Sequence, residues 1–235
     1  EMMTLQAING IKKLDIIFAS RKEGEKASIA HEIAKAHIPA DAQVIFLDFP
    51  VTFDRKKFDE IWAGHAQSIL EILKSGKDCG YLAIGDPSVY STFTHLVRNL
   101  LQQEPAVRVE VFPGITSLTA AANLLNVPLV TDGETLTIIP SAQIDAGSMK
   151  ELIQLSDNLV FMKIPSDAGV LIENLEAEGL LHHAIWVQKC CLPSQRIVKE
   201  VNAQTLEEEQ GRYLSLMIVK KEGIAKDLKG ETEEK

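Results

Sequence analysis

Two turns in the first half of the chain combine small, rigid and carboxylate-bearing residues in an order that could hold a ligand. The first is the turn Ala83–Ser91, AIGDPSVYS, which follows an apolar run and precedes a helical pattern. Ligands of open α/β sheets bind at the carboxyl ends of strands, where Gly85 would let backbone approach a ligand and Asp86 would supply a carboxylate. A plain helix start explains the same residues, with Asp86 or Ser88 as the N-cap and Pro87 in the first helical turn.

The second turn is Val111–Ser117, VFPGITS, and it opens a helical pattern whose first residues are nearly all small. Its hydroxyl residues could be helix caps and its alanines simple helix formers. Small residues at a helix start would also let a ligand lie against the backbone. About one βαβ unit separates the two turns, so both would lie at one edge of neighbouring parallel strands. Neither GxGxxG nor GxxxxGK[ST] occurs, which argues against a dinucleotide pyrophosphate or a nucleoside triphosphate.

A charged loop, Ser20–Lys26, follows the first predicted strand and is expected at the same edge. Arg21 and Lys22 could bind the carboxylates of a substrate there, and arginine favours bidentate contacts. The interleaved Glu23 and Glu25 allow the alternative that this segment is only a solvated loop.

The hydrophobic pattern predicts the elements that must position these turns. Short apolar runs alternate with amphipathic helices, which is typical of a largely parallel sheet covered on both faces. The last strands follow one another without a helix, which predicts antiparallel pairing and a mixed second sheet. The predicted helices are 3–11, 28–37, 58–73, 90–101, 117–125, 148–155 and 168–177, and the predicted strands are 14–19, 44–47, 79–84, 107–112, 136–139, 158–163, 184–190, 196–201 and 214–219.

The predicted fold class is therefore α/β with two α/β domains, the first sheet mainly parallel and the second mixed. A Pro-Gly break near the midpoint predicts an N-terminal domain over 1–112 and a C-terminal domain over 113–223. The charged tail 224–235 has little to bury and is predicted to be disordered.

Composition describes an ordinary globular chain and narrows its partners. The 235 residues are 46% hydrophobic and 24% charged, and the net charge of −9 makes nucleic acid an unfavourable partner. No signal peptide or apolar run long enough for a membrane span is expected. Three cysteines, Cys79 and the neighbours Cys190 and Cys191, are too few and too poorly spaced for a metal cluster, and the side chains of the neighbours are expected to diverge. A reducing, cytoplasmic location and no metal are predicted.

Three segments resemble a known family in order and spacing: GDPSVYSTF at 85–93, VEVFPGITSLTAAA at 109–122, and VQKCCLPSQR at 187–196. The family is that of the S-adenosylmethionine-dependent tetrapyrrole (corrin/porphyrin) methyltransferases. Within it, the YSTF continuation, SRKEGEKAS at 20–28 and YLSLMIV at 213–219 look most like the C(20)-methyltransferase branch. That branch acts on precorrin-2 or cobalt-factor II in cobalamin biosynthesis.

The resemblance implies two α/β domains with S-adenosyl-L-methionine bound in the cleft between them, S-adenosyl-L-homocysteine as its product, and a homodimer. The family also has a glycine-rich GxGPGDP loop near its start, and the sequence as given begins just downstream of that loop, so we expect residues ahead of Glu1. The implied cofactor-binding residues are Ile84, Gly85, Asp86, Val89, Thr116, Ser117, Met162 and Cys190.

The implied reaction needs alignment of a nucleophilic ring carbon with the methyl donor more than it needs acid or base catalysis. Asp86 is the candidate catalytic residue, either as a base and charge stabiliser or only as the group that holds its turn. Arg21 and Lys22 are the candidate substrate-binding cations, and Tyr90 could stack on the macrocycle.

Other functions remain open from the sequence. The methyl group could go to C(11), C(17) or the C(2)/C(7) pair of the sirohaem step, or to a protein histidine as in diphthine synthase. A chain of a different class, a non-catalytic S-adenosylmethionine or tetrapyrrole binding protein, would also carry such turns. Retention of Asp86 together with both small-residue turns favours an enzyme.

Overall fold

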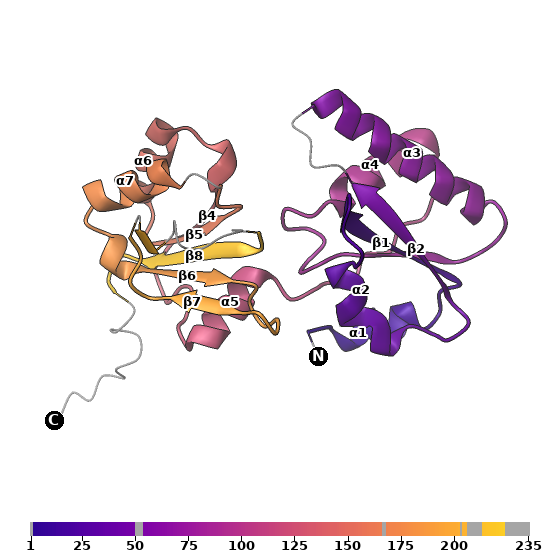
Figure 1. The fold of residues 1–235 in the computed structure, drawn as a ribbon, viewed down its shortest axis with the longest axis horizontal. Coiled ribbons are helices and arrows are strands. Elements are labelled where there is room, and N and C mark those ends of the chain that lie inside the picture. Colours follow the sequence, from indigo (N-terminus) through magenta and orange to yellow (C-terminus); the bar gives the residue numbers. More distant parts are fainter. Residues whose placement is uncertain (1, 50–53, 166–167, 203, 206–212, 224–235) are drawn as a thin grey trace. The chain divides into compact units, whose positions relative to one another are not determined.

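The computed structural model describes residues 2–49, 54–165, 168–202, 204–205 and 213–223. The chain divides into two compact units, Glu1–Thr116 and Ser117–Lys235, and each is described by itself (Figure 1). The boundary predicted after residue 112 lies four residues before this division, and the predicted disordered tail 224–235 lies outside the described residues.

The first unit is a three-stranded parallel sheet in the order β2-β1-β3. Helices α3 and α4 cover one face of the sheet, and α1 and α2 cover the other (Figure 1). The elements are α1 (Leu5–Ile11), β1 (Ile16–Lys22), α2 (Ile29–Ala34), β2 (Gln43–Phe49), α3 (Arg55–Leu73), β3 (Cys79–Leu82) and α4 (Phe93–Gln103), with a 3-10 turn at Lys35–His37.

Alternate residues of the central strand β1 point to opposite faces, as the period of a strand requires. Ile16 and Phe18 pack against α3 and α4 around the fully buried Trp62. Ile17 and Ala19 pack instead with the buried residues of α1 and α2. Burial on both faces explains why β1 reads as a continuous apolar run rather than an alternating one.

The second unit is a five-stranded mixed sheet in the order β4-β5-β8-β6-β7. Strands β4 and β5 are parallel, and the pairs β5–β8, β8–β6 and β6–β7 are antiparallel. The elements are α5 (Ser117–Leu125), β4 (Leu136–Pro140), α6 (Ala146–Leu155), β5 (Asn158–Met162), α7 (Gly169–Ala177), β6 (Ala184–Gln188), β7 (Arg196–Val198) and β8 (Ser215–Lys220), with 3-10 turns at Ser141–Gln143 and Leu181–His183.

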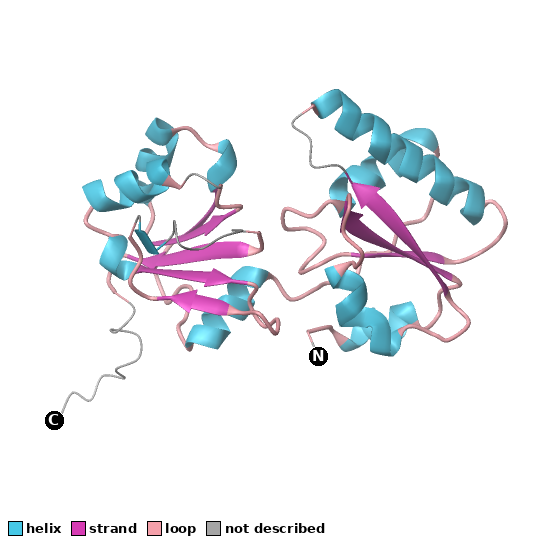
Figure 2. Ribbon diagram, viewed as in Figure 1, coloured by secondary structure: helices cyan, strands magenta, loops and turns pink. Residues whose placement is uncertain are grey.

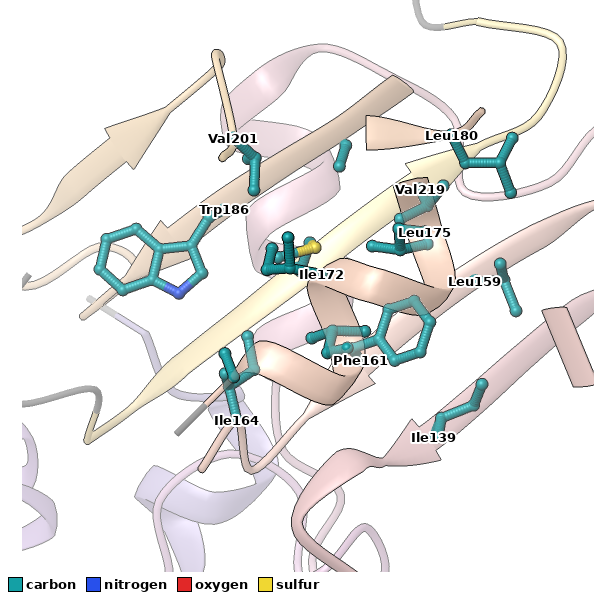
Figure 3. Packing of buried hydrophobic residues seen from close by; sticks show 14 of the residues in the cluster. Ile139, Leu159, Phe161, Ile164, Ile172, Leu175, Leu180, Trp186, Val201 and Val219 are labelled. Atoms are coloured by element: carbon teal, nitrogen blue, oxygen red, sulfur yellow. The ribbon is translucent and has the colours of Figure 1, made fainter. Parts of the chain in front are cut away.

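Both faces of this sheet are also covered by helices (Figure 2). On one face Leu159, Phe161 and Trp186 pack with α6 and α7 in the cluster drawn in Figure 3. On the other face Val160 and Ile185 pack against the small residues of α5. The predicted two-domain α/β class, with a parallel first sheet and a mixed second one, is confirmed.

One predicted strand is wrong. Residues 107–112 form neither helix nor strand, and Val109 and Val111 are 38% and 50% exposed. A strand needs hydrogen bonds to a second backbone, and residues 107–112 pair with none of the described strands. High strand propensity alone therefore did not produce a strand here.

Two smaller predictions also need correction. The last two strands of the chain do not pair with each other, because β8 lies between β5 and β6 while β7 occupies the edge beside β6. Helix α4 begins at Phe93, so Asp86 and Ser88 lie too far upstream to cap it.

None of the helices in the described parts of the chain combines the length and apolar character needed to cross a lipid bilayer.

A buried lysine ties the connection after α5 to the second sheet. Lys220, the last residue of β8, is 1% exposed and donates from Nζ to the carbonyl oxygen of Pro128 at 3.0 Å. The same Nζ lies 3.7 Å from Oε2 of Glu134. Hydrogen bonds from the Thr131 backbone and then from the Asn158 side chain lower the pKa of Glu134, so this carboxylate stays charged beside Lys220.

We predict that Lys220→Ala lowers the free energy of unfolding of the second unit by about 1–3 kcal/mol, because the Pro128 carbonyl loses its buried donor. Lys221→Ala is the matched control. Its Nζ bonds the Gln154 carbonyl on the surface, and its loss should change stability by less than about 0.5 kcal/mol. Urea unfolding followed by Trp186 fluorescence, in a Trp62→Phe background, measures both. Equal losses in the two variants would contradict the prediction.

Candidate active site

The two turns predicted to hold a ligand are joined by one carboxylate. Oδ2 of Asp86 accepts the backbone N–H of Gly114 at 2.9 Å, across 28 residues of chain. Oδ1 accepts the backbone N–H of Ser88 at 2.8 Å and is also bonded to the Ser88 hydroxyl. Asp86 therefore fixes its own turn with one oxygen and holds the Pro-Gly turn with the other. We call this arrangement the Asp86 clamp.

The clamp brings two glycine backbones into close contact. A Cβ atom on Gly114 would lie 2.0 Å from the carbonyl oxygen of Gly85 and 3.1 Å from the Cα of Asp86, so no larger residue fits without moving the turn. Gly85 has a φ of +76°, a left-handed conformation that favours glycine. A Cβ on Gly85 would meet the Ile115 carbonyl oxygen at 3.7 Å, an ordinary van der Waals distance, so the left-handed φ and not crowding favours glycine there.

The hydrogen bonds of the clamp set the protonation state of Asp86. The Ser88 hydroxyl, followed by the backbone N–H groups of Gly114 and Ser88, lowers the pKa of Asp86 below its ordinary value. A carboxylate with a lowered pKa and hydrogen bonds at both oxygens is a poor proton acceptor. The geometry therefore favours the positioning role of Asp86 over the role of a base.

Apolar and aromatic side chains surround the first turn. Ile84 is 42% exposed although it directly follows the sheet, and Tyr90 is 43% exposed with a left-handed φ of 49°. Tyr81 of β3 links the sheet to the end of this segment, because its hydroxyl oxygen lies 2.9 Å from the Oγ1 of Thr92. The exposed isoleucine and the exposed tyrosine of this turn are side chains that an apolar or ring-shaped ligand could contact.

The predicted cations lie at the same edge of the first sheet. Ala19 pairs with Leu82, so Lys22 and Gly85 each stand three residues beyond that pair, at the carboxyl ends of parallel strands. Figure 1 shows these ends of β1 and β2.

Arg21 already has an anionic partner. Its Nε and Nη2 donate to the two carboxylate oxygens of Asp48, at 2.5 and 3.2 Å, and its guanidinium carbon lies 5.0 Å from the centre of the Phe46 ring. The hydrogen bond from Arg21 lowers the pKa of Asp48, and the same bond raises the pKa of Arg21. Asp48 was not among the predicted site residues. It lies near the end of strand β2 and is the register partner of Arg21, so the pairing of the two predicted strands could have identified it.

In the second unit, the structure brings Met162 and Cys190 to one edge of the mixed sheet. Met162 ends β5 and pairs with Leu216 at the start of β8. Cys190 lies just beyond β6, where the preceding Lys189 donates its backbone N–H to the Leu214 carbonyl at 2.8 Å. The start of β8 therefore lies between the two predicted cofactor contacts.

Helix α5 completes this part of the second unit. Its Leu118, Ala121 and Ala122 are buried in the same apolar cluster against which Met162 and Cys190 pack. Thr116 and Ser117, the predicted hydroxyl contacts, lead directly from the clamped Pro-Gly turn into this helix. The structure thus places Ile84, Gly85, Asp86 and Val89 together in the first unit, and Met162, Cys190 and the start of α5 together in the second.

One important residue was not among the predicted contacts. Gly114 donates the hydrogen bond that closes the clamp and has no room for a side chain. The sequence predicts a turn at the Pro-Gly pair. The contact of Gly114 with Gly85, however, depends on tertiary structure and has no signature in the local sequence.

Comparisons with known proteins agree with this arrangement. Residues 1–207 match the sequence profile of the tetrapyrrole (corrin/porphyrin) methylases. A protein of Methanocaldococcus jannaschii named "Probable cobalt-precorrin-2 C(20)-methyltransferase" is 30% identical over 94% of this chain and 91% of its own length. The cobalt-precorrin-2 C(20)-methyltransferase of Salmonella typhimurium is 26% identical over 94% and 92%.

Solved structures share the fold. The uroporphyrin-III C-methyltransferase of Thermus thermophilus, in complex with S-adenosylhomocysteine, superposes with a TM-score of 0.67 at 20% identity, covering 99% of this chain and 91% of that one. A cobalamin-synthesis-related protein of Corynebacterium diphtheriae gives a TM-score of 0.69 at 18% identity, covering 94% and 92%.

Two α/β units, with a glycine-containing turn beyond the strands of the first, form a fold that suits a ligand-binding enzyme. The chain belongs to the tetrapyrrole (corrin/porphyrin) methylase family. It is accordingly an S-adenosylmethionine-dependent methyltransferase.

The residues present fit this cofactor. Gly85 has no side chain to keep a ligand from the backbone, Ile84 next to it offers exposed apolar surface, and Met162 and Cys190 pack with the small residues of α5 in one apolar cluster.

We predict that Gly114→Ala lowers the free energy of unfolding of the first unit by about 1–3 kcal/mol, because the added methyl group overlaps the Gly85 carbonyl. Urea unfolding followed by Trp62 fluorescence, in a Trp186→Phe background, measures the change. Gly64→Ala is the control, because Gly64 lies in α3 with nothing within 4 Å of an added Cβ and should gain about 0.5–1 kcal/mol. A Gly114→Ala variant with the stability of the native protein would refute the close contact.

Proposed function

We propose that this protein transfers a methyl group from S-adenosylmethionine to C(20) of a cobalt-containing tetrapyrrole, cobalt-precorrin-2 or cobalt-factor II, in cobalamin biosynthesis. The observation that carries the proposal is similarity along nearly the whole chain to relatives named for this reaction, at 30% and 26% identity. Metal-free precorrin-2 is the second candidate, because a Sinorhizobium relative named precorrin-2 C(20)-methyltransferase is 23% identical.

The cofactor-binding residues follow from the two groups of side chains. Ile84, Gly85, Asp86 and Val89, with Thr116 and Ser117 beyond the clamp, bind the methionine part and ribose of S-adenosylmethionine. Met162 and Cys190 contact the rest of it. When bound, this cofactor supplies a methyl group on an electrophilic sulfonium, so the protein has mainly to orient the acceptor and exclude water.

The substrate carries carboxylate side chains, whereas the protein has a net charge of −9, so local cations must bind it. Lys22 is exposed at the carboxyl end of β1 and can reach a carboxylate. Arg21 contributes as an oriented donor, because Asp48 engages two of its nitrogens while a guanidinium offers five N–H groups. Tyr90, exposed near the end of the same turn, stacks on the macrocycle.

Asp86 acts in this proposal as a positioning residue. Its clamp holds the first turn and the Pro-Gly turn in one geometry, so that the cofactor meets a preformed surface in the first unit. The lowered pKa and the occupied oxygens make it unsuited to take a proton from the ring.

A cytoplasmic homodimer is part of the proposal. Its support is the family resemblance and the three cysteines, all of them free thiols, which suit a reducing compartment. Light scattering coupled to size exclusion should give twice the mass of one chain. The mass of a single chain would remove the dimer from the proposal.

The reaction is tested by incubating the protein with methyl-labelled S-adenosylmethionine and, separately, cobalt-factor II, cobalt-precorrin-2 and precorrin-2. We expect label at C(20) of a cobalt-containing ring, located by NMR. Label on precorrin-2 alone would select the second candidate, and label at another carbon would move the protein to a different step. Cofactor binding without transfer to any ring would refute the substrate.

Asp86→Asn separates the two roles of this residue. We expect the Kd for S-adenosylhomocysteine to rise about tenfold, since a hydrogen bond to a charged group is weakened, while kcat at saturating cofactor and its pH profile stay close to those of the native enzyme. A base would instead show a fall in kcat of about 10²–10⁴ and an altered pH profile. Asp145→Asn, which changes a similar Asp-Ser hydrogen-bonded turn at the start of α6, is the control and should leave both constants unchanged.

A further inference from the structure

The two neighbouring cysteines point their sulfurs toward each other. The Sγ atoms of Cys190 and Cys191 are 3.6 Å apart, and both residues are free thiols. The expectation that these side chains diverge is therefore wrong. We call Cys190 and Cys191 the vicinal thiol pair.

The backbone of the β6–β7 turn explains this convergence. Lys189 and Cys191 both have left-handed φ angles, 48° and 59°, which rotate the side chains away from their alternation along a strand. Hydrogen bonds hold this geometry: the Cys191 N–H donates to Oε1 of Gln195 at 2.7 Å, and the Leu192 N–H donates to the Lys189 carbonyl at 2.9 Å. The close sulfurs are thus a property of a hydrogen-bonded turn.

The two thiols differ in their surroundings. Cys191 is exposed, whereas Cys190 is half-buried and packs against the apolar cluster of α5, Val187 and Leu216. Burial first, and then the neighbouring thiol, raise the pKa of Cys190 to about 12. An oxidant in solution therefore reacts first with the exposed Cys191 thiol, and the Cys190 sulfur is 3.6 Å away from it.

We propose that the vicinal thiol pair is a redox modification site, which hydroperoxides convert to a Cys190–Cys191 disulfide and which thereby weakens cofactor binding. The thiolate of Cys191 attacks the peroxide oxygen, the O–O bond breaks, and an alcohol or water leaves. The resulting sulfenic acid is attacked by the sulfur of Cys190, so that the S–S bond forms and the hydroxyl departs as water with the Cys190 proton. Two thiols lose two electrons to one peroxide.

Such a disulfide is expected to be reversible. Adjacent Cα atoms are about 3.8 Å apart, closer than the 4.4 to 6.8 Å usual for disulfides, and a strained bridge is readily reduced. In a reducing compartment it would form only transiently, as regulatory disulfides do.

The effect on the cofactor rests on the proposed function. Forming the bond requires the sulfurs to close from 3.6 Å to about 2.05 Å. We expect this closure to pull Cys190 on the cluster that it shares with α5 and Met162, and to strain the turn whose left-handed angles hold the two thiols. Both changes alter the surface assigned to the cofactor in the second unit.

The first experiment detects the bond itself and needs no enzyme activity. The reduced full chain is treated with equimolar hydrogen peroxide, alkylated and digested with trypsin, which releases CCLPSQR, residues 190–196, with both cysteines. We expect this peptide to escape alkylation, to weigh two hydrogens less than its reduced form, and to become alkylated after dithiothreitol. Cys79→Ser should behave in the same way. Sulfinic acid at Cys191 with Cys190 alkylated, or a bridge between two chains, would overturn the proposal.

The second experiment measures S-adenosylhomocysteine binding by calorimetry. We expect peroxide to weaken binding at least tenfold and dithiothreitol to restore it. The Cys191→Ser variant should keep the native affinity and ignore peroxide. A disulfide that leaves the affinity unchanged would refute the link to the cofactor. Reduced protein that fails to bind would count against the proposed function, while the peptide result would still decide the modification site.

Discussion

The Asp86 clamp is the interaction on which the candidate active site depends. The hydrogen bonds that Asp86 accepts from Ser88 and Gly114 link two turns that are distant in sequence, where the Gly85 and Gly114 backbones are in close contact. Gly114 lies near the end of the first unit, so the clamp holds its last turn against the turn at Gly85. A single carboxylate thus organises the group of proposed cofactor contacts in the first unit.

The hydrophobic pattern predicts most strands of the two sheets, because each residue of a strand faces one side of the sheet and must be apolar where that side is covered. Ile16 and Ile17, which face opposite sides of the first sheet, show how a doubly covered strand becomes a continuous apolar run. The same reasoning failed for 107–112, where the valines have the correct spacing but the segment pairs with none of the described strands. Pairing is a property of two segments, so one segment's pattern cannot establish it.

Side-chain partners were harder to predict, and for a common reason. The sequence offers Arg21 as a cation for a substrate carboxylate, but not its partner Asp48, which is 27 residues away and meets it through the register of β1 and β2. As sequence neighbours Cys190 and Cys191 are expected to diverge, whereas left-handed residues turn the chain there and bring the two sulfurs together. The residue types at the site were visible in the sequence, but their contacts follow from backbone conformation and tertiary pairing.

A carboxylate used for architecture is consistent with the proposed reaction. Methyl transfer from a sulfonium needs no strong acid, because the electrophile arrives with the cofactor, and its barrier falls mainly through alignment. A site that uses the Asp86 carboxylate to fix two turns gains the rigidity that alignment demands, and the reaction does not need this carboxylate as a base. The lowered pKa of Asp86 follows from the same hydrogen bonds, so its protonation state and its positioning role have one cause.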